Sequence, residues 1–315
     1  MAEFQSLAYF RDRLIPAAEA KLSIYDLGIV MGATVTDMAR TYRHEPFRLK
    51  DHLVRFYESC KYARLKVPLS FDEAERVTRE LTGNNVQELA AKEDLAIVYF
   101  ITPGENPIYA GLAAAAVHLE PTFCIHTFPL PFSNWAHLFR DGAHVVTPSI
   151  RHIPPQCVDP KIKCRSRMHW WLADQEAHLV DPKAVTLLLD TEGNVTETGG
   201  SNFLIAKHGA LISPTARNTM RGISRQNVIE LCAKLAITFV ERDFQVHDVI
   251  NADEAFLTTT PYGIAPATRI NGLPIGSGKL GPLFTRIAAA WSEQVGFDIL
   301  EQNCSSERQA AERSG

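Results

Sequence analysis

The sequence lacks the paired motifs of metal sites and disulfide scaffolds. Its six cysteines are scattered without a Cys-x-x-Cys pair, and none of its eleven histidines forms a His-x-x-x-His pair. Zinc sites need closely spaced ligands, and disulfide scaffolds are short and rich in cysteine. We therefore expect reduced, mostly buried thiols and no bound metal.

The chain also lacks an excess of basic charge and a long apolar run. Lys and Arg number 32 against 36 Asp and Glu, a net charge of −4, which offers no basic surface for nucleic acid. No apolar run approaches the roughly 18 residues that a spanning helix needs. The N-terminus lacks the basic-then-apolar layout of a signal peptide. We expect a cytoplasmic protein with no nucleic-acid or membrane partner.

What is present is a globular composition long enough for about two domains. The chain has 315 residues, of which 46% are hydrophobic and 22% charged. The Pro129-Leu130-Pro131-Phe132 segment cannot continue a strand ladder and is the candidate linker. We predict domains at residues 1–128 and 129–302, followed by a polar tail at 303–315.

Hydrophobic periodicity predicts strands and helices in both halves. The first half is predicted to form helices at 51–64 and 70–83, the second opened by a Ser70–Glu73 capping box, and strands at 95–101 and 123–128.

In the second half, a helix at 166–179 is predicted to turn Met168, Trp171, Leu172 and Ala173 inward. The other predicted elements are strands at 185–189 and 255–260, hairpins across 207–209 and at Asn271-Gly272, and helices at 223–235 and 283–295. Hairpins mixed with helices favour an α+β fold with mixed sheets over one doubly wound sheet.

A glycine-rich segment, Gly276 to Gly281, matches the dinucleotide pattern G-x-G-x-x-G. Only 34 residues follow it, too few for the rest of such a domain. Leu280 also replaces the Ser or Thr of a phosphate-binding P-loop. We interpret the segment as a turn before a helix.

Two charged residues point to a cofactor. Lys163 precedes a helix, where desolvation would lower the pKa of an amine and make it a nucleophile; Lys161 is its competitor. Glu197 is followed by Gly199-Gly200, which lets the backbone approach a flat ring while the carboxylate holds a ring N–H⁺.

An anion site is predicted from two further segments. Gly222-Ile223-Ser224 opens a helix whose free backbone N–H groups attract an anion, and Ser224 adds a hydroxyl. The hydroxyls of Thr258, Thr259 and Thr260 cluster at a strand end. Pyridoxal 5′-phosphate combines the three groups that these residues would bind: an aldehyde for the lysine, a basic ring nitrogen for the glutamate and a phosphate for the anion site.

With these residues in order, the chain resembles the class IV aminotransferases, which include branched-chain and D-amino-acid aminotransferases and aminodeoxychorismate lyase. The resemblance covers roughly Leu22 to Gly296. The matching segments are Phe47–Phe56, Ile162-Lys163 with Ala173–Ala177, Val195–Phe203, Gly222–Arg225, Ala252–Thr260 and Ile275–Pro282.

The resemblance implies a two-domain fold type IV PLP enzyme, similar to D-amino-acid aminotransferase. Such a fold has a smaller N-terminal α/β domain and a larger C-terminal domain with mixed and antiparallel sheets. It implies that Lys163 binds the cofactor aldehyde and moves the substrate proton, and that Glu197 pairs with the pyridine nitrogen. It also implies a homodimer, ping-pong kinetics and the following phosphate ligands: Arg55, Ile223, Ser224, Thr259 and Thr260.

The departures from the family pattern concern the substrate. Pro103 stands where D-amino-acid aminotransferases carry a carboxylate-binding arginine, and residues 95–111 contain no arginine at all. The substrate candidates are Arg40, which matches a family arginine, Tyr99, and the two arginines after the lysine, Arg165 and Arg167.

The leading hypothesis is a class IV transaminase with an amino-acid donor, branched-chain-like by default, and a keto-acid acceptor. One alternative is a lyase of the aminodeoxychorismate type, using the same cofactor to eliminate pyruvate. Others are a D-amino-acid transaminase, an R-selective amine transaminase and a non-catalytic protein on the same fold. Loss of the carboxylate arginine favours the amine transaminase slightly.

Overall fold

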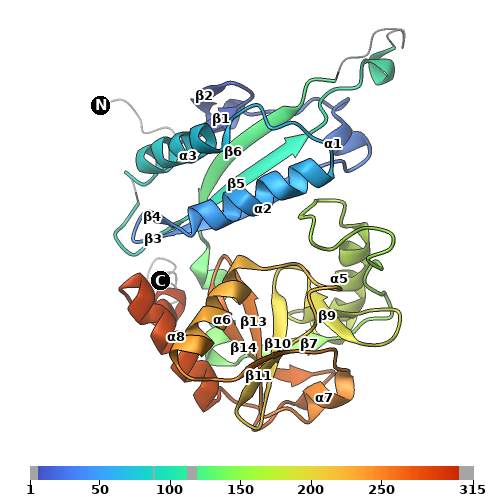
Figure 1. Cartoon of the computed structure of the whole chain (residues 1–315), viewed down its shortest axis with the longest axis vertical. Coiled ribbons are helices and arrows are strands. Elements are labelled where there is room, and N and C mark those ends of the chain that lie inside the picture. The colour runs from blue at the N-terminus through green and yellow to red at the C-terminus, as the bar shows by residue number, and fades with distance from the viewer. Residues whose placement is uncertain (1–5, 88, 112–118, 305–315) are drawn as a thin grey trace, which may run out of the picture. The chain divides into compact units, whose positions relative to one another are not determined.

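The computed structural model describes residues 6–87, 89–111 and 119–304, which form two compact units (Figure 1). Unit 1 runs through Leu130 and includes Ile162–Arg167. Unit 2 contains Pro131–Lys161 and the chain from Met168 onward. The domain boundaries predicted from the sequence stay a prediction. Of the predicted polar tail, residues 305–315 lie outside the described part.

Unit 1 is built on a six-stranded sheet in which every neighbouring pair is antiparallel, in the order β2-β1-β6-β5-β3-β4. Its strands are β1 (Leu7–Phe10), β2 (Arg13–Pro16), β3 (Val35–Tyr42), β4 (Glu45–Phe47), β5 (Leu95–Thr102) and β6 (Thr122–Pro129). The continuous apolar run of β5 is buried at every position, because it lies in the interior of the sheet.

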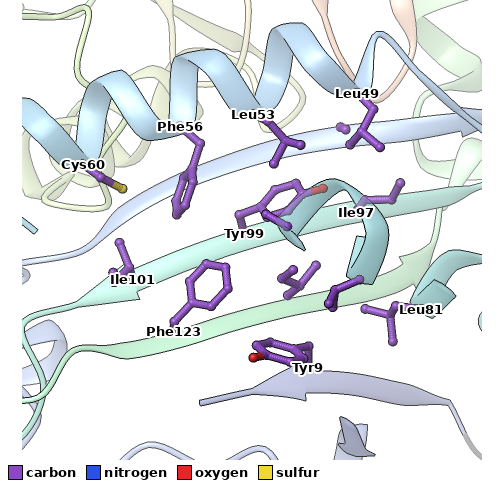
Figure 2. Packing of buried hydrophobic residues seen from close by; sticks show 14 of the residues in the cluster. Tyr9, Leu49, Leu53, Phe56, Cys60, Leu81, Ile97, Tyr99, Ile101 and Phe123 are labelled. Atoms are coloured by element: carbon purple, nitrogen blue, oxygen red, sulfur yellow. The ribbon is translucent and has the colours of Figure 1, made fainter. Parts of the chain in front are cut away.

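Two long helices cover one face of this sheet: α2 (Leu49–Tyr62) and α3 (Phe71–Asn85). The predicted capping box opens α3, with Ser70 and Glu73 each bonding the other's backbone N–H. Figure 2 shows the α2 side chains Leu53, Phe56 and Cys60 directed at the sheet. Among the described residues, unit 1 also contains the short helix α1 (Leu27–Val30) and 3₁₀ turns at Ala17–Glu19 and Pro107–Ala110.

Unit 2 is built on a nine-stranded mixed sheet with the order β12-β11-β10-β13-β14-β7-β8-β9, in which β15 pairs with β14 and β9 also pairs with β10. Three of the pairs are parallel, and the others are antiparallel. The strands are β7 (Ala143–Val146), β8 (Val185–Leu189), β9 (Val195–Thr198), β10 (Asn202–Lys207), β11 (Ala210–Ser213), β12 (Phe239–Glu241), β13 (Glu254–Thr259), β14 (Gly263–Ile270) and β15 (Leu273–Pro274).

Several helices of unit 2 lie against this sheet. Among them, α6 follows the predicted range closely and packs against β13, as does α8. The helical segments are α4 (Ala136–Arg140), α5 (Met168–Val180), α6 (Ile223–Lys234), α7 (Val246–Ile250), α8 (Pro282–Val295) and a 3₁₀ turn, Phe132–Asn134. Asn271 and Gly272 both have positive φ in the β14–β15 turn, as the predicted hairpin requires.

The predicted inward face of α5 was right for Ala173 and wrong for the other three residues. Met168, Trp171 and Leu172 are 69%, 61% and 49% exposed, whereas Ala173 is buried together with Trp170. The helix carries apolar residues all round, so periodicity alone could not select the buried face. Contact with β8 selects it, because small Ala173 lets the helix approach the sheet.

No helix in the described ranges is long and apolar enough to cross a membrane. None of the six cysteines forms a disulfide. Three are buried (Cys60, Cys124 and Cys232) and Cys164 is half-buried, whereas Cys157 and Cys304 are exposed, so fewer thiols are buried than expected. Among the residues that the structure describes, no three His, Cys, Asp or Glu side chains gather as a metal site would require.

Candidate active site

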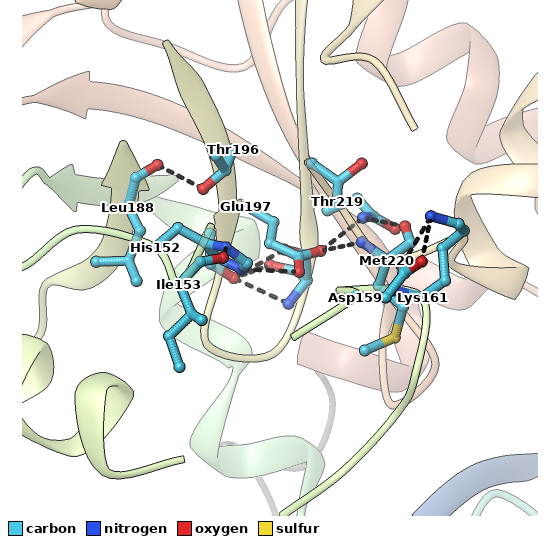
Figure 3. Close-up of polar contacts among 12 residues, drawn as sticks. His152, Ile153, Asp159, Lys161, Leu188, Thr196, Glu197, Thr219 and Met220 are labelled. Atoms are coloured by element: carbon cyan, nitrogen blue, oxygen red, sulfur yellow. Dashed lines mark hydrogen bonds and ion pairs between the residues drawn. The ribbon is translucent and has the colours of Figure 1, made fainter. Parts of the chain in front are cut away.

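Glu197 lies in β9 of unit 2 with its carboxylate held from one side (Figure 3). Its Oε2 accepts hydrogen bonds from Asn202 Nδ2 at 3.0 Å and from the Met220 backbone N–H at 3.1 Å. Its Oε1 lies 3.6 Å from His152 Nε2, beyond hydrogen-bond range. One oxygen of a buried carboxylate therefore stays available to accept a hydrogen bond from a ligand.

The other ring nitrogen of His152 has a partner of its own. Its Nδ1 lies 3.0 Å from the Ile153 carbonyl, which can only accept, so Nδ1 carries the hydrogen. The imidazole also makes an edge contact with Trp170 at 5.8 Å between ring centroids, which fixes its plane.

The start of α6 lies beside this carboxylate. Gly222 is the N-cap, and the first turn has neither a side-chain cap nor an acidic residue, so its N–H groups are available to an anion. A Cβ on Gly222 would overlap the Asn202 side-chain oxygen. This close approach requires glycine and connects the helix terminus to the residue that holds Glu197. Ser224, in the same first turn, is buried.

The threonine cluster lies across the sheet from Asn202. Thr258 is paired in register with Asn202 on β10, and its buried hydroxyl has no hydrogen-bond partner. Thr259 donates its hydroxyl to the Gly200 carbonyl, and half-buried Thr260 follows the strand. A buried hydroxyl without a partner is costly, so a ligand that supplies acceptors would fit here.

Lys163 lies in unit 1, in an extended segment on the edge of β3. Its carbonyl accepts from the Thr36 N–H at 2.9 Å, and its own N–H lies 3.4 Å from Ser59 Oγ. Its competitor, Lys161, belongs to unit 2 and places Nζ 2.7 and 2.9 Å from the two oxygens of Asp159. The Lys161 side chain is therefore engaged with a carboxylate of its own unit.

Arg55 lies on α2 with its guanidinium directed at Asp37 of β3. Nε and Nη2 each donate to the Asp37 carboxylate at 2.8 Å, and His52 Nδ1 lies 2.8 Å from the same group. Burial alone would raise the pKa of Asp37, but the charge of Arg55 and these hydrogen bonds hold it well below its usual range. The sequence analysis assigned no role to Asp37 or His52.

Two of the substrate candidates have other partners. The Tyr99 hydroxyl donates to Thr78 Oγ1 at 2.8 Å on the helix-covered face of the sheet, inside the core. Arg40 is buried, forms an ion pair with Asp94 at 3.3 Å and stacks over the ring of Tyr42. These contacts give both residues a structural role. Arg165 and Arg167 lie in the segment that contains Lys163, and both are exposed.

The predicted residues thus divide between the units. Lys163 and Arg55 belong to unit 1. Unit 2 brings Glu197 close to the helix start at Ile223 and Ser224 and to the hydroxyls of Thr259 and Thr260. Two residues around Glu197 were not predicted from the sequence. Asn202 lies inside a segment that matches the family but was given no role. His152 lies 45 residues before Glu197, so no local sequence pattern connects the two.

A family model described as amino-transferase class IV matches residues 34–270. The chain belongs to the class IV aminotransferases. It is 30% identical, over 89% of its length and 93% of the other's, to a Methanocaldococcus jannaschii protein provisionally named a branched-chain-amino-acid aminotransferase. It is 28% identical to the D-alanine aminotransferase of Bacillus licheniformis, over 91% and 96%.

The fold of this class IV aminotransferase is that of fold type IV PLP enzymes. The PLP form of the branched-chain amino acid aminotransferase from Thermobaculum terrenum superposes with a TM-score of 0.80 at 25% identity, over 96% of this chain and 97% of the other. Class IV aminotransferases use pyridoxal 5′-phosphate. The open Glu197 oxygen, the uncapped start of α6 and the unpartnered Thr258 hydroxyl suit its ring nitrogen and its phosphate.

Proposed function

We propose that this aminotransferase moves the amino group of a branched-chain amino acid to a 2-keto acid. The observation that carries the proposal is the Glu197 carboxylate, buried, anchored through Oε2 and open at Oε1. The relatives named for branched-chain amino acids support the choice of donor. The relative named for D-alanine makes D-amino acids the second candidate.

The chain's own groups divide the work. When bound, pyridoxal 5′-phosphate supplies an aldehyde for an amine and a ring that takes up an electron pair. Glu197 Oε1 would accept the ring N–H and keep that nitrogen protonated. Lys163 Nζ would hold the aldehyde, and the same amine would take the proton from the substrate Cα. The first-turn N–H groups of α6, with Ser224 and Thr260, would hold the phosphate, whereas Arg55, the phosphate ligand that the resemblance implied, is paired with Asp37 in unit 1.

A donor screen on the purified holoenzyme tests the substrate class. L-leucine, D-alanine, a chiral primary amine and aminodeoxychorismate are each added alone, and the cofactor absorbance is followed through a single turnover. We expect L-leucine to convert the spectrum, and a 2-keto acid to restore it. Pyruvate released from aminodeoxychorismate without a keto-acid requirement would establish the lyase instead, and conversion by D-alanine alone would establish the D-amino-acid enzyme.

The nucleophile is tested with two lysine variants. Lys163→Ala is expected to abolish turnover and covalent labelling by borohydride, because it removes the amine that binds the aldehyde. Lys161→Ala removes only the ion pair with Asp159 and serves as the control. Full activity of the first variant together with an inactive second variant would reverse the assignment.

The exposed apolar face of α5 supports a homodimer. Trp171 and Leu172 are joined there by Leu179, which is 88% exposed, and by Val180. Several large apolar side chains exposed on one helix mark a candidate association surface. We propose that a second copy of the chain covers it. Light scattering should give twice the chain mass for the wild type and a smaller mass for Leu179→Glu; an unchanged dimer in that variant would refute this surface.

A further inference from the structure

The segment that contains Lys163 continues as an extended strand edge. The Arg165 N–H donates to the Thr34 carbonyl at 2.9 Å, the Thr36 N–H donates to the Lys163 carbonyl at 2.9 Å, and Cys164 faces Val35 between them. Side chains alternate along extended backbone, so Lys163 and Arg165 leave it on the same side. Their Cα atoms are then about 6.6 Å apart, at roughly 3.3 Å per residue.

The Arg165 guanidinium packs against an aromatic ring and not against a carboxylate. Its guanidinium lies 5.1 Å from the centroid of the Phe100 ring, and the residue is exposed. Within residues 6–87, 89–111 and 119–304, no carboxylate pairs with it. By contrast, the buried arginines Arg40, Arg55 and Arg225 each pair with an Asp or Glu. A cation stacked on an aromatic face and left without a counter-ion is prepared for an anionic ligand.

The surroundings of Arg165 contain a neutral hydrogen-bonding group. His126, on β6, lies 6.2 Å from Phe100 between ring centroids. Burial, and then the positive charge of Arg165, lower the pKa of His126 below its usual 6.5. The ring is therefore neutral near pH 7 and can donate one hydrogen bond to an anion that Arg165 attracts.

These groups lie on the face of the six-stranded sheet that the core does not use. The core cluster takes Ile97, Tyr99 and Ile101 from β5, whereas Phe100 alternates to the opposite face. His126 is likewise outside that cluster, which takes Phe123 and Ile125 from β6. The side of the sheet that presents Arg165 is thus separate from the side covered by α2 and α3.

We propose that Arg165 binds the α-carboxylate of the amino-acid substrate, with Phe100 and His126 positioning its guanidinium and completing the site. The inference rests on the proposed function, in which Lys163 acts at the substrate Cα. The carboxylate is bonded to that same carbon, so its counter-ion must lie on the same side as the lysine and within one side-chain length. Arg165 meets this requirement two residues away, and residues 95–111 offer no arginine.

The test compares donors with and without a carboxylate. The holoenzyme and its Arg165→Gln variant are each reacted in single turnover with the best amino acid from the donor screen and with the primary amine that lacks only the carboxylate. Arg76→Gln, an exposed arginine of α3 paired with Glu80, is the matched control. A charged hydrogen bond of the usual strength predicts an increase of about 10- to 100-fold in the apparent dissociation constant of the amino acid.

The same variant should react with the amine within about twofold of the wild type, because no carboxylate is present to lose a partner. Arg165→Lys keeps the charge and should recover part of the amino-acid affinity, and it replaces the glutamine variant if that one does not fold. Cofactor absorbance and borohydride labelling should be unchanged in both, because Arg165 does not hold the cofactor.

Three results would overturn the inference. These are an unchanged amino-acid constant in Arg165→Gln, an equal loss for amino acid and amine, and a carboxylate-selective loss in Arg167→Gln instead. A wild-type enzyme that converts none of the amino acids would refute the proposed function itself, and this outcome is visible before any variant is made.

Discussion

Replacing Asp37 with asparagine should destabilise unit 1, because it leaves the buried Arg55 guanidinium without its counter-ion. The Asp37 carboxylate is fully buried, accepts from Arg55 and His52, and also accepts from the Met38 N–H at 2.7 Å. Its pKa lies well below the usual range, so it is ionised and neutralises Arg55 between β3 and α2. Asparagine keeps the shape but removes the charge.

The expected cost is that of an uncompensated buried ion. Breaking a buried pair by removing one partner costs about 3 to 5 kcal/mol, because the other charge stays desolvated. With a denaturant slope of about 2 kcal/mol/M in urea, the unfolding midpoint should fall by about 1.5 to 2.5 M. The loss should appear first in unit 1, where both partners lie.

The assay must follow unit 1 separately. All four tryptophans, at positions 135, 170, 171 and 291, belong to unit 2, so their fluorescence reports on that unit. Hydrogen exchange of amides in β3 and α2 reports on unit 1. The control is Asp51→Asn on α2, which breaks a half-buried pair with Arg48 and should cost less than the fully buried pair. Equal protection in the two variants would refute the reasoning.

Three further outcomes are expected. Glu197→Gln should keep the hydrogen bonds from Asn202 and the Met220 N–H and unfold at the wild-type temperature. Its turnover rate should fall about 10- to 100-fold, because an amide cannot replace the charge that faces the ring nitrogen. Full turnover would contradict this. Gly222→Ala should displace Asn202 and weaken cofactor binding about tenfold in a fluorescence titration, whereas unchanged affinity would show that the amide moves freely. Burial lowers the folded-state pKa of His52, and the charge of Arg55 lowers that of Asp37, so both groups contribute fully to stability above pH 6.5. The contribution of His52 declines as the pH falls below 6.5. The contribution of Asp37 declines only below about pH 3.8. Urea midpoints measured from pH 7 to 3 should therefore fall, with a shallower decline in Asp37→Asn below pH 4, and a midpoint that rises on acidification would contradict the signs.

Local signals were sufficient for several elements. The capping box placed the start of α3, the apolar run of 95–101 placed β5, and the hairpin across 207–209 formed as predicted. Each of these depends on contacts within a few residues, or on a composition that suits only a buried strand. No strand was predicted for β1 to β4, because these short strands acquire their pattern from distant neighbours.

The sequence by itself determined the family, the cofactor chemistry and the identity of the charged groups, because motifs in a given order survive without knowledge of the fold. Only the tertiary structure decided which charged side chains form ion pairs. It paired Arg55 with Asp37 and Lys161 with Asp159, turned Trp171 outward, and left Arg165 beside an aromatic ring without an acid. Ion pairing and the face of a helix depend on residues far apart in the chain, which come together only when the sheets form.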